Sequence, residues 1–144
     1  MRELILQWKA ATFEVATPCD PHLTQLYTLV NIYNLTSLYI AATGPIPDEK
    51  MDLLKKKLTM EGPRPPRIVV SLVNRLDIEQ CMNTAEDLAS RADVVCISGG
   101  PDALCTALAI EAKTHGKMIC FVVDPRPTEM RKRKPFEVLR LVNV

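Results

Sequence analysis

The sequence predicts an α/β protein with a Rossmann-like open, mostly parallel sheet and helices on both faces. Segments in which apolar residues alternate with polar ones are separated by segments in which apolar residues recur every three to four positions. Two of the strand segments, 94–97 and 118–123, are apolar throughout, which is typical of central parallel strands covered on both faces. Because 144 residues suffice for one hydrophobic core, we expect a single domain over 1–144.

The first predicted strand covers 3–8 together with 12–16, as one bent strand or two short ones, and Pro18 ends it. Asp20 followed by Pro21 is typical of a helix start. The helix is expected to end near Asn34, and its apolar stripe comprises Leu23, Leu26, Tyr27 and Val30.

The next predicted strand, 37–41, leads into a turn at 44–48 that contains glycine and two prolines. Asp48 can cap a helix that reaches residue 58. The expected buried side of this helix carries Met51, Leu54 and Leu58. The proline-rich stretch 62–66 is expected to be a stiff loop, since neither side of it is large enough to be a domain alone.

The second half of the chain continues the alternation of strands and helices. Gly116 suits the left-handed position that ends a helix. In the helix at 78–90, the side expected to face the sheet carries Ile78, Met82, Ala85 and Ala89. The remaining predicted elements are strands at 67–73, 93–97, 117–123 and 136–142 and a helix at 102–114.

Composition and charge exclude several classes of protein. With 18 Lys and Arg against 17 Asp and Glu, the net charge of +1 excludes a strongly basic nucleic-acid coat protein. No apolar stretch approaches the ~20 residues of a membrane span, and no secretory signal opens the chain, so we expect a soluble, cytoplasmic protein. Five cysteines without a CxxC pair and only two histidines give no metal motif. We therefore expect no metal and no cofactor.

The loop from Ser98 to Asp102 is the first candidate for a binding site. Ligands of open parallel sheets bind beyond the carboxyl ends of the strands, and this loop follows a buried strand and precedes a helix. Gly99 and Gly100, which precede Pro101, let the backbone approach a phosphate. Ser98 and Thr106 add hydroxyl groups. Asp102 repels a polyanion unless its charge caps the helix. The alternative is that the two glycines only permit a tight turn.

Polar residues after the other strands are further candidates for the same site. Thr17 and Pro18 follow the first strand, Asn74 and Arg75 follow the third, and Arg126 follows the strand at 117–123. For Asn74 the alternative is a purely local turn. From 124 to 140 six basic and three acidic side chains make a basic segment, which attracts nucleotides or nucleic acid but is more often a solvated surface. Nucleic acid could bind through the run Arg131, Lys132, Arg133 and Lys134 of this segment, but we do not favour this interpretation.

The segment from Val94 to Leu104, followed by a helix rich in small residues and a strand from Lys117 to Asp124, resembles the signature region of CARF domains, the CRISPR-associated Rossmann-fold sensors. In that family a buried strand runs into a loop similar to Thr-Gly-Gly-Thr-Lys. The Thr17–Pro18 turn and the helix that opens at Asp77 look like further landmarks of the family. The resemblance implies a homodimer that binds a cyclic oligoadenylate across its two-fold axis. Some members also cleave the ring as metal-independent ring nucleases.

Two other classes remain open. The segment 39–41 and the turn Gly44-Pro45 are similar to nucleoside deoxyribosyltransferase-like enzymes, which rely on a glutamate nucleophile in a helix, and Glu111 lies one turn beyond the matching position, Leu108. A non-catalytic dimeric interaction module would leave no catalytic signature at all. Cys19 at a helix start is a weak candidate for a nucleophile, because no partner base lies near it in the sequence.

Overall fold

A computed structural model describes residues 12–19, 25, 26, 28, 29, 34–61, 66–123, 126–133 and 140–143. The strands of the described chain are β1 (Thr12–Pro18), β2 (Asn34–Ala42), β3 (Arg67–Leu72), β4 (Val94–Cys96), β5 (Met118–Val123) and β6 (Arg140–Asn143). The helices given bounds in the same part of the chain are α3 (Asp48–Glu61), α4 (Ile78–Arg91), α5 (Asp102–Thr114) and α6 (Thr128–Arg133). The predicted segments 3–8, 62–65 and 136–139 lie outside the described residues.

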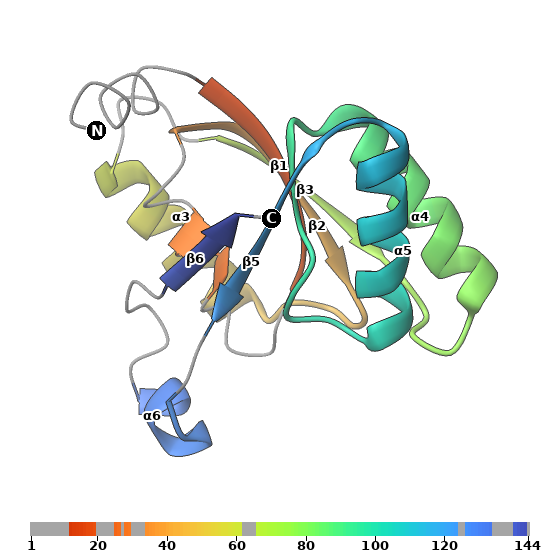
Figure 1. The fold of residues 1–144 in the computed structure, drawn as a ribbon. Helices are drawn as coiled ribbons and strands as arrows, with labels where there is room; N and C mark the ends of the chain where they lie inside the picture. The colour runs from red at the N-terminus through yellow and green to blue at the C-terminus, as the bar shows by residue number, and fades with distance from the viewer. Residues whose placement is uncertain are drawn as a thin grey trace.

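The strands form one sheet in the order β3-β2-β1-β4-β5-β6 (Figure 1). The pairs from β3 to β5 are parallel, and β6 pairs antiparallel with β5 at one edge. The predicted open, mostly parallel α/β architecture is therefore confirmed. The connection from β1 leads to β2 on one side, whereas β4 lies on the other side of β1, so the strand order reverses between β1 and β4.

The bounds of β1 and β2 differ from the sequence prediction. β1 includes Pro18, which pairs with Ala41 rather than ending the strand before it. β2 already begins at Asn34, whereas the predicted strand began at residue 37. Of that helix, residues 25, 26, 28 and 29 are described and are helical, with Leu26 and Leu29 fully buried. The early start of β2 follows from its pairing with the whole of β1, from Thr12 onward.

A separate core covers each face of the sheet. On one face Leu26, Leu29 and, from α3, Leu54 pack on Val15 and Ile40 of β1 and β2. On the other face α4 and α5 pack on the neighbouring residues of the same strands, which point the opposite way; these include Ala16, Tyr39, Ala41 and Val95. In Figure 1 α4 and α5 lie side by side over that second face. The chain runs from the carboxyl end of β3 into α4 and from the carboxyl end of β4 into α5, so both helices begin at that edge of the sheet.

The face that α4 turns to the sheet differs from the predicted one. Its buried residues are Cys81, Ala85, Leu88 and Ala89, whereas Ile78 and Met82 are exposed. The helix has two apolar stripes at helical spacing, and the one from Cys81 to Ala89 covers the sheet. The predicted contact of Ile78 and Met82 with the sheet was therefore wrong, while that of Ala85 and Ala89 was right.

The ends of α4 and α5 show two further local features. Asp77 is the N-cap of α4, and its Oδ1 accepts a hydrogen bond of 3.0 Å from the Gln80 amide. Gly116 has a φ of 66°, the left-handed conformation expected after α5. The N-cap of α5 is Pro101 rather than Asp102, and no side chain caps this helix. In the described chain no helix is long and apolar enough to cross a membrane.

Replacing Asp77 by alanine is expected to lower the free energy of unfolding by about 1 kcal/mol, because the Gln80 amide loses its capping acceptor. Urea denaturation followed by circular dichroism measures the loss. Asp77→Asn keeps a side-chain oxygen at the cap and should retain most of the stability. An equal loss in both variants would show that the negative charge, rather than the capping hydrogen bond, stabilises α4.

Candidate functional site

A cavity of about 490 Å³ lies beyond the carboxyl ends of the parallel strands. Its walls come from the segments that follow β1, β2, β3 and β4, so it spans the point where the strand order reverses. This is the position where open α/β sheets bind ligands. The lining residues are Cys19, Ala42, Thr43, Gly44, Pro45, Ile46, Pro47, Lys50, Arg75, Gly99, Gly100 and Pro101.

The two glycines of the β4–α5 loop are required by close packing. Gly99 has a φ of 88°, and a Cβ there would lie 2.1 Å from Gln25 Oε1. A Cβ on Gly100 would lie 2.6 Å from the Cβ of Pro18. These close contacts support the alternative that the two glycines serve the chain's own turn. The same absence of side chains leaves their backbone at the wall of the cavity.

The amino end of α5 presents backbone N–H groups next to this loop. The first backbone hydrogen bond of the helix runs from the Cys105 amide to the Pro101 carbonyl. The amides of residues 102–104 therefore have no acceptor within the helix, and no side chain replaces it. Together with the helix dipole, these groups give the Pro101 side of the cavity a partial positive charge.

Ser98 and Thr17 do not line the cavity. Their hydroxyls form hydrogen bonds with other groups of the chain at the ends of β1 and β4. The Ser98 hydroxyl accepts a 2.9 Å hydrogen bond from the Val122 amide of β5 and lies 3.4 Å from Gln25 Oε1. Thr17 is fully buried; its hydroxyl donates to the Pro18 carbonyl at 2.7 Å and accepts from Gln25 Nε2 at 2.8 Å. Both hydroxyls are thus engaged by other groups of the chain, and neither residue lines the cavity.

Gln25 is a residue that the sequence analysis missed. Its amide is almost completely buried and joins Thr17, Pro18 and Ser98, so it connects the end of β1 to the β4–α5 loop. A single glutamine in an amphipathic helix has no distinctive spacing, and no sequence signal marks it as buried. Its neighbour Leu26 indicated only that the helix packs on the sheet.

The two candidates after β3 have different roles. Asn74 forms a local turn, since its Oδ1 accepts a 3.0 Å hydrogen bond from the Leu76 amide, and it does not line the cavity. Arg75 does line the cavity, is exposed and makes no ion pair with any part of the described chain. The alternative reading of Asn74 as a turn residue is thus supported, and Arg75 remains a candidate.

Four other candidates lie away from the cavity lining. Asp102 and Thr106 line a separate groove between α4 and α5. Arg126 follows β5 and does not line the cavity, and Pro18 is a buried support of Gly100. In the basic segment, α6 holds residues 131–133, and Lys134 lies outside the described residues. The structure therefore separates the Asp102 side chain from the wall formed by Gly99 and Gly100.

The β2–α3 loop supplies half of the cavity and was not assigned from the sequence. Residues 43–47 form an apolar wall that includes Ile46 and two prolines, and Lys50 from the first turn of α3 adds a positive charge. The sequence signal was the position of this turn after a strand, but no residue in it stood out chemically. Lys50 and Arg75 are the cationic side chains at the cavity within the described chain.

The thiols near the loop differ in their environment. Hydrogen bonds with Cys120, Ser98 and Thr17 hold the pKa of the Cys96 thiol below its ordinary value, against the opposing effect of burial. Burial raises the pKa of the Cys105 thiol, which donates to the Gly100 carbonyl at 3.5 Å. Neither Cys96 nor Cys105 lines the cavity. Cys19 does line the cavity, but no histidine or carboxylate of the described chain lines it beside Cys19.

Among solved structures, the chain is similar to Can2 from Sulfobacillus thermosulfidooxidans, determined in complex with cyclic tetra-adenylate, with a TM-score of 0.59 and 13% sequence identity. The similarity covers 78% of this chain and 32% of that chain, so this chain spans about a third of the length of Can2. At this identity the likeness shows the fold. No protein-family model and no curated protein matches the sequence.

Replacing Gly100 by alanine is expected to lower the free energy of unfolding by about 1–3 kcal/mol, because the new Cβ overlaps the Pro18 ring. Chemical denaturation measures the loss. Gly44→Ala is the matched control at the same cavity: a Cβ there has no neighbour within 4 Å, so stability should be nearly unchanged. Equal stability of the two variants would contradict the packing role of Gly100.

Proposed function

We propose that this chain binds a cyclic oligoadenylate or a closely related nucleotide at the cavity, and that two chains share one ring. The observation that carries the proposal is the combination, at the reversal point of the strand order, of a glycine loop, an uncapped helix end and two cationic side chains. The resemblance to CARF domains and the shared fold with Can2, whose structure holds cyclic tetra-adenylate, support the choice of ligand.

The phosphate part of such a ligand fits the polar wall. The N–H groups at the start of α5 and the backbone of Gly99 and Gly100 can donate to phosphate oxygens. Arg75 and Lys50 supply the positive charge that a phosphodiester needs. The Asp102 carboxylate lies in the neighbouring groove, so it does not oppose an anion from inside the cavity wall.

The base of a nucleotide fits the opposite wall. Ala42, Pro45, Ile46 and Pro47 form a surface without charge, on which a purine can pack. A volume of about 490 Å³ lies in the lower half of the range of roughly 300–1,000 Å³ for small-molecule sites. A cavity of this size suits part of a ring of several nucleotides, which supports a site completed by a second chain.

Binding without rapid cleavage is the function that the lining supports. Ring cleavage requires a ribose 2′-hydroxyl aligned for attack and neutralisation of the phosphate, and a general base adds speed. The described lining supplies cations but no histidine, aspartate or glutamate. We therefore propose a sensor or a protein that sequesters the nucleotide, with slow ring opening by positioning alone as the second outcome of the test below.

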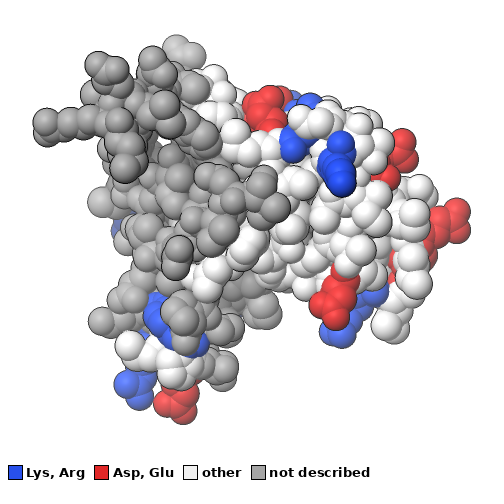
Figure 2. All heavy atoms as spheres, in the orientation of Figure 1, with Lys and Arg blue, Asp and Glu red and all other residues white. Residues whose placement is uncertain are grey.

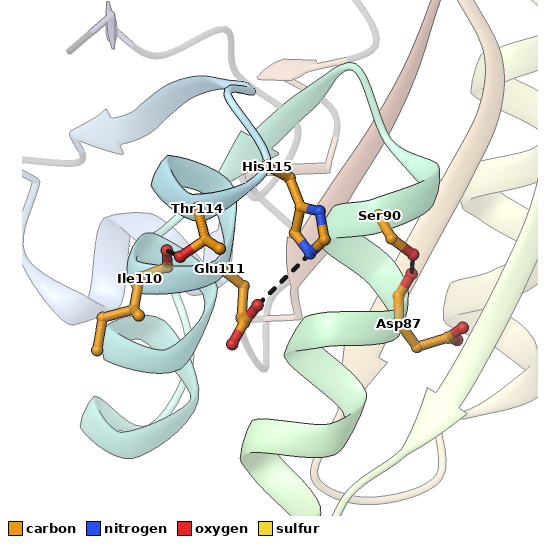
Figure 3. Close-up of polar contacts among 6 residues, drawn as sticks. All are labelled: Asp87, Ser90, Ile110, Glu111, Thr114 and His115. Carbon is orange, nitrogen blue, oxygen red and sulfur yellow. Dashed lines mark hydrogen bonds and ion pairs between the residues drawn. The ribbon is translucent and has the colours of Figure 1, made fainter.

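The geometry does not support a deoxyribosyltransferase-like reaction. Leu108 is fully buried, and Glu111 lines the groove between α4 and α5 rather than the cavity. The Glu111 carboxylate lies 3.5 Å from the His115 ring nitrogen (Figure 3). A nucleophile of that enzyme class must reach the sugar of the bound nucleoside, and no described carboxylate lines the cavity.

Calorimetry with cyclic tetra- and hexa-adenylate, with chromatography of the nucleotide afterwards, tests the proposal. We expect binding that weakens as salt rises, and unchanged rings over the time of the titration. Appearance of linear products would make the chain a ring nuclease. Absence of binding by both rings at micromolar protein would overturn the proposal and favour the interaction-module alternative.

Lys50→Glu and Arg75→Glu are each expected to weaken binding at least tenfold, since each replaces attraction for phosphate by repulsion. Lys56→Glu is the matched control: it lies on the same helix as Lys50, is exposed and does not line the cavity. Circular dichroism checks that all three variants remain folded. Equal affinities in the Lys50 and Lys56 variants would remove Lys50 from the site.

A further inference from the structure

Two cysteines that the proposed function does not use lie opposite each other in neighbouring strands. Cys96 of β4 and Cys120 of β5 are register partners in a parallel pair. Both belong to the same core on one face of the sheet, so their side chains point the same way. Both are fully buried, and neither takes part in a disulfide bond. We call Cys96 and Cys120 the thiol pair.

The spacing of the two strands allows a disulfide bond between the members of the thiol pair. Neighbouring strands lie about 4.8 Å apart, within the roughly 4.4–6.8 Å between Cα atoms that a disulfide spans. The Cβ atoms of a disulfide lie about 3.8 Å apart, so closing the bond draws the two side chains together by about 1 Å. A disulfide under such strain is reduced easily, as regulatory disulfides are. The thiol pair therefore has the geometry of a reversible bond.

The surroundings of Cys96 favour its reaction with an oxidant. Its Sγ lies 3.4 Å from Ser98 Oγ, and hydrogen bonds with Cys120, Ser98 and Thr17 lower the pKa of the Cys96 thiol. These groups are neutral, whereas the charged side chains of the described chain in Figure 2 lie at the surface. Oxidants react with the thiolate, which the hydrogen bonds stabilise. Ser98 is partly exposed, so the thiol pair lies directly beneath a residue that solvent reaches.

The thiol pair is also connected to the wall of the cavity. Ser98 follows β4 and accepts a 2.9 Å hydrogen bond from the Val122 amide, two residues beyond Cys120. The next residue is Gly99, which lines the cavity and has no room for a side chain above Gln25. A closely packed interior transmits strain rather than absorbing it. A shift of β4 against β5 therefore displaces this part of the wall.

We propose that the thiol pair is a redox switch: hydrogen peroxide oxidises Cys96 and Cys120 to a disulfide, which displaces the β4–α5 loop and weakens nucleotide binding. The Cys96 thiolate attacks the O–O bond and becomes a sulfenic acid, and the hydroxide released takes up the proton that the thiol lost. The Cys120 thiol then attacks that sulfur, and the S–O bond breaks to release water. Two thiols and one peroxide thus give one disulfide and two waters. The effect on binding rests on the proposed function, whereas the disulfide does not.

Peptide mapping of the full chain after treatment with hydrogen peroxide is the first test. Remaining thiols are alkylated, and the tryptic peptides should contain a bond between Cys96 and Cys120 that dithiothreitol removes. Cys105→Ser is the matched control that should still form this bond, because Cys105 shares a tryptic peptide with Cys96. Cys120→Ala should not form it, and circular dichroism checks that this variant is folded. A chain in which Cys96 and Cys120 stay unlinked would overturn the inference.

Two further measurements connect the bond to the loop. Hydrogen exchange followed by NMR should show the Val122 amide exchanging at least tenfold faster after oxidation, because its hydrogen bond to Ser98 is lost. Calorimetry with cyclic tetra-adenylate should show roughly threefold weaker binding or more, because the N–H groups of the loop lose their alignment with phosphate. Dithiothreitol should restore both values. In Cys120→Ala, peroxide should change neither.

The outcomes separate the switch from the proposed function. A disulfide that leaves the exchange of the Val122 amide unchanged would overturn the switch. Equal binding by the reduced and the oxidised chain would overturn the switch and leave the proposed function standing. If the reduced chain binds no ring, the proposed function fails alone, and the peptide map and the exchange rate still decide whether the thiol pair moves the loop.

Discussion

The site depends on one buried polar side chain, the Gln25 amide. It donates to the Thr17 hydroxyl and the Pro18 carbonyl at the end of β1 and lies within 3.4 Å of the Ser98 hydroxyl. Ser98 in turn accepts from the Val122 amide of β5. An unpaired polar group at this depth costs about 1–3 kcal/mol, so these bonds fix the ends of β1, β4 and β5 relative to one another. The backbone of Gly99 can approach only because it has no side chain above Gln25.

The alternation of apolar periods was enough to predict the sheet and most element boundaries. α5 begins and ends where expected, at Asp102 and Thr114, because proline and glycine punctuate both ends. Where a predicted boundary differed from the structure, contacts with distant parts of the chain determined the boundary. β2 starts at Asn34 because it pairs with β1 from Thr12 onward. The residues 34–36 contain no sequence signal for that pairing.

The cavity lies at the edge of the sheet where the sequence predicted a site, but several of the predicted side chains do not line it. The position follows from topology, which the sequence pattern contains. The direction of a side chain does not: the hydroxyls of Ser98 and Thr17 turn inward to buried partners, and Asp102 turns into the next groove. Sequence spacing cannot distinguish these directions. The part of the cavity wall formed by the β2–α3 loop was not predicted, because apolar residues and one lysine occur in many loops.

The two apolar stripes of α4 also show that sequence spacing does not decide which side chains are buried and which are exposed. A helix that covers one face of a sheet needs one apolar stripe, and Ala85, Leu88 and Ala89 supply it. Ile78 and Met82 add nothing to that contact and remain in water, where apolar side chains gathered on one surface favour association. Ile78 opens α4 three residues beyond Arg75, which lines the cavity, so the exposed stripe begins close to the candidate site along the chain.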